Sequence, residues 1–113
     1  MRNEDAVEAE IQSKGLNAPR LTPADIDAAI VSEHWFRASD AAAALGQPET
    51  EALKTLTLCV LVLRNGFIVT GESACASPEN FDAELGRKIA RDNARNKIWA
   101  LEGYLLRERL SAA

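Results

Sequence analysis

The sequence predicts an α+β fold in which an antiparallel β-hairpin packs on a long C-terminal helix, with short N-terminal helices beside it. Two observations support this prediction. Two apolar runs, residues 56–63 and 67–70, meet at Asn65-Gly66, a dipeptide typical of a type I′ hairpin turn. A stripe of apolar residues spaced by three to five positions then runs from Phe81 to Leu105, as expected of a helix that lies on a sheet.

Length and composition limit the possible classes of protein. The chain has 113 residues, of which 47% are hydrophobic and 27% charged, with a formal net charge of −4. This length predicts one domain, and the acidic balance disfavours general binding to nucleic acid. No apolar run is long enough to span a membrane. Because no export signal follows Met1, we expect Cys59 and Cys75 to be free thiols in a reducing compartment.

The N-terminal part of the chain predicts an arm followed by short helices. Residues 1–20 are polar and only weakly periodic, so we expect a flexible or loosely docked arm there and a single α+β domain over residues 21–113. Thr22-Pro23-Ala24-Asp25 is a helix start, and the helix is expected to continue to about Trp35 or Phe36. Residues 39–45 and 50–56 predict two further short helices.

The hairpin is expected to be apolar on both faces. A two-residue turn at Asn65-Gly66 places Cys59 opposite Glu72, and it gives two sets of residues on opposite faces: Leu58, Val60, Val62, Phe67 and Val69, and Cys59, Leu61, Leu63, Ile68 and Thr70. One helix covers only one face, and a lone two-stranded ribbon also leaves open edges. The sequence therefore predicts a homo-oligomer whose interface uses one face of the hairpin.

Arginines recur on the C-terminal helix, which is expected to begin between Ser77 and Asn80 and to bend at Gly103. Arg87, Arg91 and Arg95 are four positions apart and form a ridge. Guanidinium groups match the paired oxygens of phosphate and carboxylate, so the ridge is a candidate anion site. The alternative is a solvated helix face, partly balanced by Glu84 and Asp92.

The loop from Glu72 to Asp82 is the second candidate site. It joins the end of a strand to the start of a helix, where free backbone N–H groups favour anions. The alternative is that Ser77 and Asn80 cap the helix and that Phe81 fills the core. Glu72 follows a buried strand and needs a partner, for which Arg87 or Arg91 is available.

No pattern in the chain predicts catalysis. Nothing in the sequence places Cys75 near His34, the single histidine, and one histidine with two distant cysteines has no metal-ligand spacing. The phosphate-loop and dinucleotide-binding motifs are also missing from the loop after the second strand. We therefore expect no catalytic residues, no metal site, no cofactor and no enzymatic activity.

Three segments resemble a small bacteriophage and prophage family named for gene product forty-nine and gene sixty-six of two podophages. They are Asn65-Gly-Phe-Ile-Val-Thr-Gly-Glu-Ser-Ala-Cys, Pro78-Glu-Asn-Phe-Asp-Ala-Glu-Leu-Gly-Arg-Lys-Ile-Ala and Leu101-Glu-Gly-Tyr-Leu-Leu. The similarity runs from about Pro19 to Leu110. It implies a phage-encoded protein that acts in the host bacterial cytoplasm, and it assigns no roles to particular residues.

In outline the expected architecture is also similar to phage sponge proteins that sequester nucleotide-derived immune signals, such as cyclic ADP-ribose isomers. This resemblance implies a non-enzymatic counter-defence protein that binds a small phosphorylated nucleotide-type signal near a subunit boundary. The predicted ligand-binding residues are Glu72, Ser73, Ser77, Asn80, Phe81, Arg87, Arg91, Tyr104 and Arg107. The arginines are expected to meet phosphate, the loop from Ser73 to Asn80 to meet ribose or base, and Tyr104 or Phe81 to stack.

A second interpretation of the same residues is a phage host-takeover protein. In this case the helix ridge and the hairpin edge bind and inhibit a host protein. An arginine ridge suits a phosphate and an acidic protein surface equally well, so the sequence leaves both interpretations open.

Overall fold

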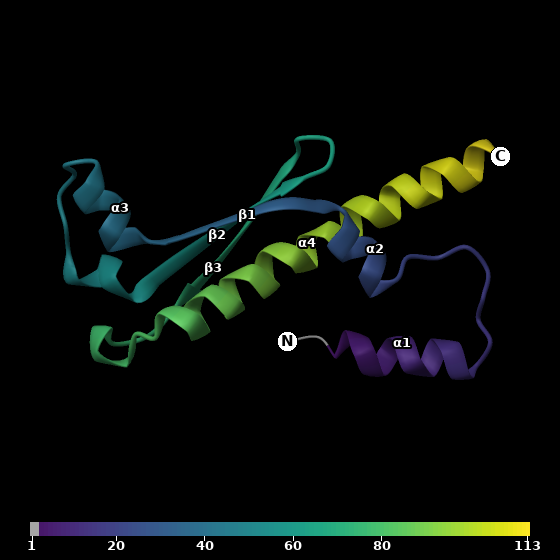
Figure 1. Ribbon diagram of the computed structural model, residues 1–113, viewed down its shortest axis with the longest axis horizontal. Coiled ribbons are helices and arrows are strands. Elements are labelled where there is room, and N and C mark those ends of the chain that lie inside the picture. Colours follow the sequence, from purple (N-terminus) through teal and green to yellow (C-terminus); the bar gives the residue numbers. More distant parts are fainter. Residues whose placement is uncertain (1–2) are drawn as a thin grey trace.

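The computed structural model describes residues 3–113, which form a three-stranded antiparallel sheet crossed by one long helix (Figure 1). The strands are β1 (Ile30–Arg37), β2 (Leu56–Leu63) and β3 (Ile68–Ala74), in the spatial order β1-β2-β3. The helix is α4 (Ala83–Ala112). The predicted α+β class is therefore confirmed, with β2 as the central strand.

Short helices precede and connect the strands. They are α1 (Glu4–Ser13), α2 (Pro23–Ala28) and α3 (Ala38–Ala44), together with the 3₁₀ turns η1 (Glu51–Thr55) and η2 (Pro78–Asn80). Helix α2 begins where the sequence predicts, because Thr22 accepts a hydrogen bond from the Asp25 backbone N–H while the Asp25 side chain accepts one from the Thr22 N–H.

The prediction that this helix continues to Trp35 or Phe36 is wrong. Helix α2 ends at Ala28, and residues 30–37 form β1, which pairs with β2 from Ile30 opposite Leu63 to Arg37 opposite Thr57. The segment is rich in β-branched and aromatic residues, which favour a strand once a neighbouring strand is available. The hairpin is therefore part of a three-stranded sheet, and β1 covers one of its edges.

The hairpin turn also differs from the prediction. Gly66 has a φ of +86°. Within residues 3–113 only glycines have a positive φ, so Asn65 does not adopt the geometry of a type I′ turn, which requires a positive φ at both central residues. The Gly66 N–H donates to the Leu63 carbonyl and the Leu63 N–H to the Phe67 carbonyl, both at 2.8 Å, which closes a three-residue loop over residues 64–66. The pairing consequently moves by one residue, and Cys59 lies opposite Gly71 rather than Glu72.

This register decides which side chains enter the core. One face of the sheet packs against α4 and α2, and the buried residues there are Ile26, Ala29, Cys59, Leu61, Leu63, Val69, Ala90, Ala94 and Ile98. The opposite face, called the outer face below, carries Ser32, His34 and Phe36 from β1, Leu58, Val60 and Val62 from β2, and Ile68, Thr70 and Glu72 from β3. The expected grouping of Val69 with Val62, and of Ile68 with Leu61, is therefore wrong.

Helix α4 lies very close to β3 at one point. A Cβ atom added to Gly71 would overlap the backbone of Ala90 and Ala94, so only glycine fits there. The helix begins at Ala83, after the 77–80 segment in which its start was predicted, because Asp82 is the residue that caps it. It also continues through Gly103, where a bend was expected, to Ala112.

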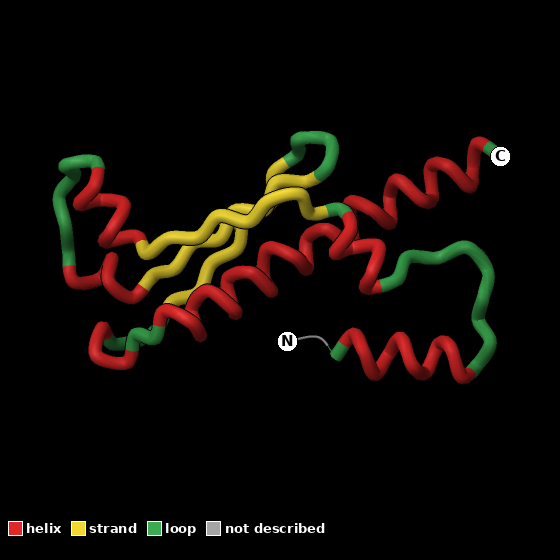
Figure 2. Tube along the Cα trace, viewed as in Figure 1, coloured by secondary structure: helices red, strands yellow, loops and turns green. Residues whose placement is uncertain are grey.

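The molecule is elongated, with principal extents of 53 × 29 × 17 Å. Its radius of gyration of 17.5 Å exceeds the value of about 13 Å expected for a compact domain of this length. In Figure 2 the C-terminal part of α4 extends past the sheet, and a long loop joins α1 to α2. The segment expected to be a flexible arm thus contains a helix, while its flexibility stays a prediction.

Candidate ligand-binding site

Charged and aromatic side chains gather where β1 faces the first turns of α4. Because side chains alternate along a strand, Glu33, Trp35 and Arg37 point to the α4 side of β1. They meet three side chains from α4 and the segment just before it. The six residues, called the arginine–aromatic cluster below, are Glu33, Trp35, Arg37, Phe81, Arg87 and Arg91.

Glu33 binds two arginines of α4, Arg87 and Arg91. The Nε of Arg87 lies 3.2 Å from one carboxylate oxygen of Glu33, and the Nε of Arg91 lies 3.2 Å from the other. The guanidinium of Arg87 also lies 5.1 Å from the centroid of the Trp35 ring, within the range of a cation–π contact. Two cations therefore share one anion, and the cluster keeps an excess of positive charge.

A second stacked pair extends the cluster toward the end of β1. The guanidinium of Arg37 lies 3.7 Å above the centroid of the Phe81 ring, and its Nε donates to the Lys54 carbonyl at 2.6 Å. Phe81 is thus partly buried beneath a cation, which differs from a role as a core plug. Arg87 and Trp35 remain open to solvent, with exposed fractions of 48% and 40%.

The structure separates Arg95 from the predicted arginine ridge. Arg95 is only 9% exposed and donates to Asp27 at 2.8 Å, to Glu4 at 2.5 Å and to the carbonyl of Pro23 at 3.2 Å. These bonds raise its pKa even though burial alone lowers it. Arg95 therefore joins α1 and α2 to α4, and only Arg87 and Arg91 remain for a ligand.

Of the predicted site residues before α4, Phe81 belongs to the cluster, and the others do not. Glu72 is exposed on the outer face, on the other side of the sheet from Arg87 and Arg91, so neither arginine is its partner. Ser73 lies opposite Thr57 and is partly buried. Ser77 and Asn80 bound the short turn η2, and neither side chain caps α4 because Asp82 accepts the hydrogen bond from the Leu85 N–H.

Tyr104 and Arg107 lie far from the cluster. Tyr104 follows Arg87 by 17 positions on one continuous helix, which is about 25 Å at 1.5 Å per residue. It instead lines an apolar groove of about 410 Å³ between the hairpin tip and α4. The groove is also lined by Phe67, Leu101 and Leu105, and the Arg64–Glu102 ion pair lies at its edge.

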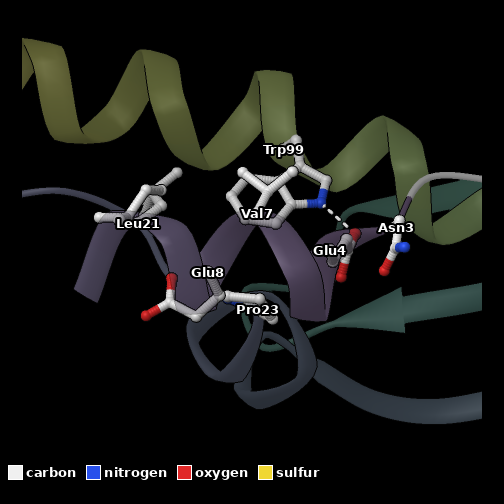
Figure 3. A pocket seen from close by; sticks show the side chains of 8 residues that line it. Asn3, Glu4, Val7, Glu8, Leu21, Pro23 and Trp99 are labelled. Carbon is white, nitrogen blue, oxygen red and sulfur yellow. Dashed lines mark hydrogen bonds between the residues drawn. The ribbon is translucent and has the colours of Figure 1, made fainter. Parts of the chain in front are cut away.

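Helix α1 covers another small cavity, of about 170 Å³. Figure 3 shows the Trp99 ring of α4 beside Val7 and Leu21, with its Nε1 donating to Glu4 at 2.7 Å. Arg20 fixes the end of the long loop, because its guanidinium donates to both carboxylate oxygens of Glu8. These contacts hold α1 against α4 and the long loop, and the cavity is a consequence of this packing.

Sequence reasoning missed Glu33, Trp35 and Arg37. The helix expected over this segment would have placed Glu33 and Trp35 on different faces, whereas a strand places Glu33, Trp35 and Arg37 together. The available signal was the density of β-branched and aromatic residues from Ile30 to Phe36.

The most reactive side chains lie apart from one another. His34 is on the outer face and contacts Ser32 at 3.0 Å, whereas the thiol of Cys75 donates to the Ser77 carbonyl at 3.4 Å. Burial raises the pKa of the Cys59 thiol, so this cysteine stays protonated. Both cysteines are free, as predicted, and residues 3–113 contain no group of side chains suited to hold a metal ion.

Comparisons with known proteins identify the family. Among the described residues, no helix has both the length and the apolar character needed to cross a membrane. Neither the curated proteins nor the solved structures contain a match to this chain. The model of one protein family matches residues 21–110, which include the whole sheet and all six residues of the cluster. The chain therefore belongs to the phage protein family described as N4 Gp49/phage Sf6 gene 66.

Proposed function

We propose that this phage protein binds a small phosphorylated nucleotide-type ligand at the arginine–aromatic cluster and sequesters it without chemical change. In this role it acts as a counter-defence protein in the host bacterial cytoplasm and removes an immune signal from its receptor. The observation that carries the proposal is the sharing of one carboxylate, that of Glu33, by Arg87 and Arg91 beside the exposed ring of Trp35.

Charge supports an anionic ligand. Within the contacts described for residues 3–113, Arg87 and Arg91 each use only Nε to bind Glu33. Their terminal amino groups remain as donors for a phosphate, and Glu33 fixes the direction of both guanidinium groups. Because paired N–H donors match phosphate oxygens, this arrangement favours a phosphate held from two sides.

The aromatic residues support a nucleotide over inorganic phosphate. Trp35 presents a half-exposed ring next to Arg87, and a nucleobase can stack on such a ring while its phosphate meets the guanidinium. Stacking of a base on an aromatic side chain contributes about 1–3 kcal/mol and tolerates any base. The cluster therefore suits the two chemically different ends of one nucleotide.

The positions of the reactive groups favour capture over turnover. Binding needs only affinity, whereas hydrolysis or transfer needs a nucleophile or a base aimed at the ligand. His34 lies on the other side of the sheet from the cluster, and the Cys59 thiol is buried and protonated. The protein is accordingly proposed to be a binding protein and not an enzyme.

Calorimetric titration with AMP, ADP and ADP-ribose tests this proposal. We expect the wild-type protein to bind at least one of these nucleotides, and Arg87→Ala and Arg91→Ala each to weaken binding about tenfold. A hydrogen bond to a charged group contributes about 1.5–3 kcal/mol, and 1.4 kcal/mol is a factor of ten. Trp35→Leu is expected to weaken the binding of nucleotides and to leave the binding of inorganic phosphate unchanged.

Arg107→Ala is the matched control, since Arg107 is an exposed arginine on the same helix outside the cluster. This variant is expected to bind like the wild type. The proposal fails if no nucleotide binds the wild-type protein, or if the Arg87→Ala/Arg91→Ala double variant binds as tightly as the wild type.

The apolar groove favours a second candidate function, host takeover by binding a host protein. Phe67 and Tyr104 are 54% and 72% exposed at this groove, and its volume suits the side chains of a protein partner. If this function holds, a host protein is retained by the wild-type chain in a pull-down and lost with Tyr104→Ala. Nucleotide binding is then absent.

A further inference from the structure

Helix α1 is bound to the rest of the molecule through two carboxylates that are four positions apart. The carboxylate of Glu4 accepts hydrogen bonds from Arg95 and from the indole Nε1 of Trp99, one at each oxygen. One helical turn later, both oxygens of Glu8 accept hydrogen bonds from the guanidinium of Arg20. The surface that receives α1, called the acid-binding groove below, consists of Arg20, Leu21, Pro23, Arg95 and Trp99. It binds acidic residues at a helical spacing.

The two glutamates are better covered than the aliphatic residue between them. The side chains of Glu4 and Glu8 are 14% and 22% exposed, whereas the residue Val7 is 54% exposed. Figure 3 shows Val7 beside the Trp99 ring and Leu21, and these side chains line the cavity of about 170 Å³. An apolar cavity of about 150 Å³ has room for benzene, so a larger side chain fits at the position of Val7. Helix α1 therefore fills the groove incompletely.

Two properties of α1 indicate that it can leave the groove. None of its ten residues, Glu4–Ser13, is buried. An isolated helix of this length is also only marginally stable in water, so docking has to offset the entropy of ordering it. Segments with few buried apolar contacts open at a low free energy, and α1 is such a segment.

We infer that the acid-binding groove also binds an acidic amphipathic helix of a partner protein, which replaces α1. The side chains of α1 that line the contact are Glu4, Val7, Glu8 and Ile11. Residues at this spacing share one face of a helix. A fitting partner therefore carries glutamate at positions i and i+4 and large apolar side chains at i+3 and i+7. Insertion of an amphipathic helix into a groove is a common mode of peptide recognition.

The surroundings of Arg95 favour a helix over a small free anion. Arg95 is 9% exposed, and its bonds to Asp27 and to the Pro23 carbonyl come from α2, so they hold the guanidinium when α1 leaves. The groove then offers a fixed cation beside the apolar surfaces of Trp99 and Leu21. A carboxylate on an amphipathic helix meets both, whereas a small anion meets only the cation. The groove shares no residue with the arginine–aromatic cluster, so partner binding does not depend on the nucleotide site.

Helix α1 competes with a partner for the groove. Residues 14–22 join α1 to α2, and a short linker of this kind gives an effective concentration in the millimolar range. A partner helix is therefore expected to bind the wild-type chain weakly, because only chains with α1 released are available to it. Loosening α1 raises the affinity for the partner, whereas unfolding of the chain lowers it.

Fluorescence anisotropy with a labelled synthetic peptide tests this inference on the full-length chain. The peptide has the sequence of residues 3–16 with blocked ends and the substitution Val7→Leu, and it serves as the model of a partner helix. We expect the Glu4→Gln chain to bind the peptide about tenfold more tightly than the wild-type chain, because the loss of a charged hydrogen bond loosens α1. Glu10→Gln is the matched control and is expected to bind like the wild type, because Glu10 is exposed and pairs with Lys14 on the surface of α1.

Two further peptides define the chemistry that the groove recognises. The Glu4→Gln/Glu8→Gln peptide is expected not to bind, and the Val7→Ala/Ile11→Ala peptide is expected to bind about tenfold more weakly. Unchanged binding of either peptide contradicts the inference, and so does a Glu4→Gln chain that binds no more tightly than the wild type. Nucleotide titration of the Glu4→Gln chain is expected to match the wild type, so these outcomes do not bear on the ligand site.

Discussion

Arg87 and Arg95 show how neighbours decide the role of a side chain. The two residues are eight positions apart on α4, and the sequence alone assigns them to one ridge. In the folded chain Arg95 binds Glu4 and Asp27 and is nearly buried, whereas Arg87 shares Glu33 and stays half exposed. The partners come from residues 4, 27 and 33, which no local spacing connects to α4. The sequence therefore predicted that arginines of α4 form the candidate anion site, but it did not predict which of them remain available for a ligand.

Gly71 allows the first stability prediction. Gly71→Ala is expected to lower the free energy of unfolding by about 3 kcal/mol, because the added Cβ overlaps the backbone of α4 at Ala90 and Ala94. Urea denaturation followed by circular dichroism measures this change. An unaltered urea midpoint would show that α4 and β3 are not in close contact.

Gly103→Ala is the matched control on the same helix. Its Cβ would meet only Leu21 Cδ1, at 4.0 Å, which is ordinary van der Waals contact. Alanine in a helix interior is favoured over glycine by about 1 kcal/mol, so this variant is expected to be more stable than the wild type. The opposite signs of the two substitutions separate steric overlap from helix propensity.

At the scale of elements, β1 and the hairpin turn show where local patterns mislead. The capping residues at Thr22 and Asp25 correctly start a helix, but the pairing of residues 30–37 with β2 ends it. Long-range pairing of this kind depends on partner residues 20 to 33 positions away in the sequence. At the turn, Asn65-Gly66 correctly predicted a hairpin, while the three-residue loop fixed a register one residue away from that expected.

Helix α1 gives a prediction on pH. None of its residues is buried, and its contact with the long loop is the ion pair of Glu8 and Arg20. Hydrogen bonds from Arg20 hold the pKa of Glu8 at about 2, below its ordinary value of 4.5. Because the folded-state pKa is lowered, this contact stabilises the docked arm above pH 4.5 and is lost as the pH falls from about 4.5 toward 2.

Carboxyl chemical shifts measured by NMR during an acid titration test this prediction. Glu8 is expected to titrate near pH 2 in the wild type and near 4.5 in Arg20→Gln, which removes the partner. A wild-type Glu8 that titrates in the ordinary range would mean that Arg20 does not hold it in solution.

At the scale of the whole molecule, the two sides of the sheet differ. The side facing α4 holds the core and, at its β1 edge, the proposed ligand site, while Leu58, Val60 and Val62 of β2 lie on the outer face. The apolar character of both faces was visible in the sequence of β2, which is why association was expected. Which residues face which way was not visible, because it depended on the register of the turn.

The distribution of charge over the molecule also matters for the ligand. The chain has a net charge of −4, yet the cluster contains three arginines and one glutamate. An extended polyanion such as DNA would be repelled by the acidic remainder, while a small anion meets only the local positive excess. This arrangement favours a nucleotide-sized ligand.

Release of a captured ligand tests the central proposal most directly. The wild-type chain and the Arg87→Ala/Arg91→Ala variant are incubated with extract from phage-infected, immune-activated bacteria, washed, denatured by heat and analysed by mass spectrometry. We predict that the wild type releases an intact phosphorylated nucleotide, about one per chain, and that the variant releases none. An equal release from both proteins, or a converted product formed many times per chain, would contradict it.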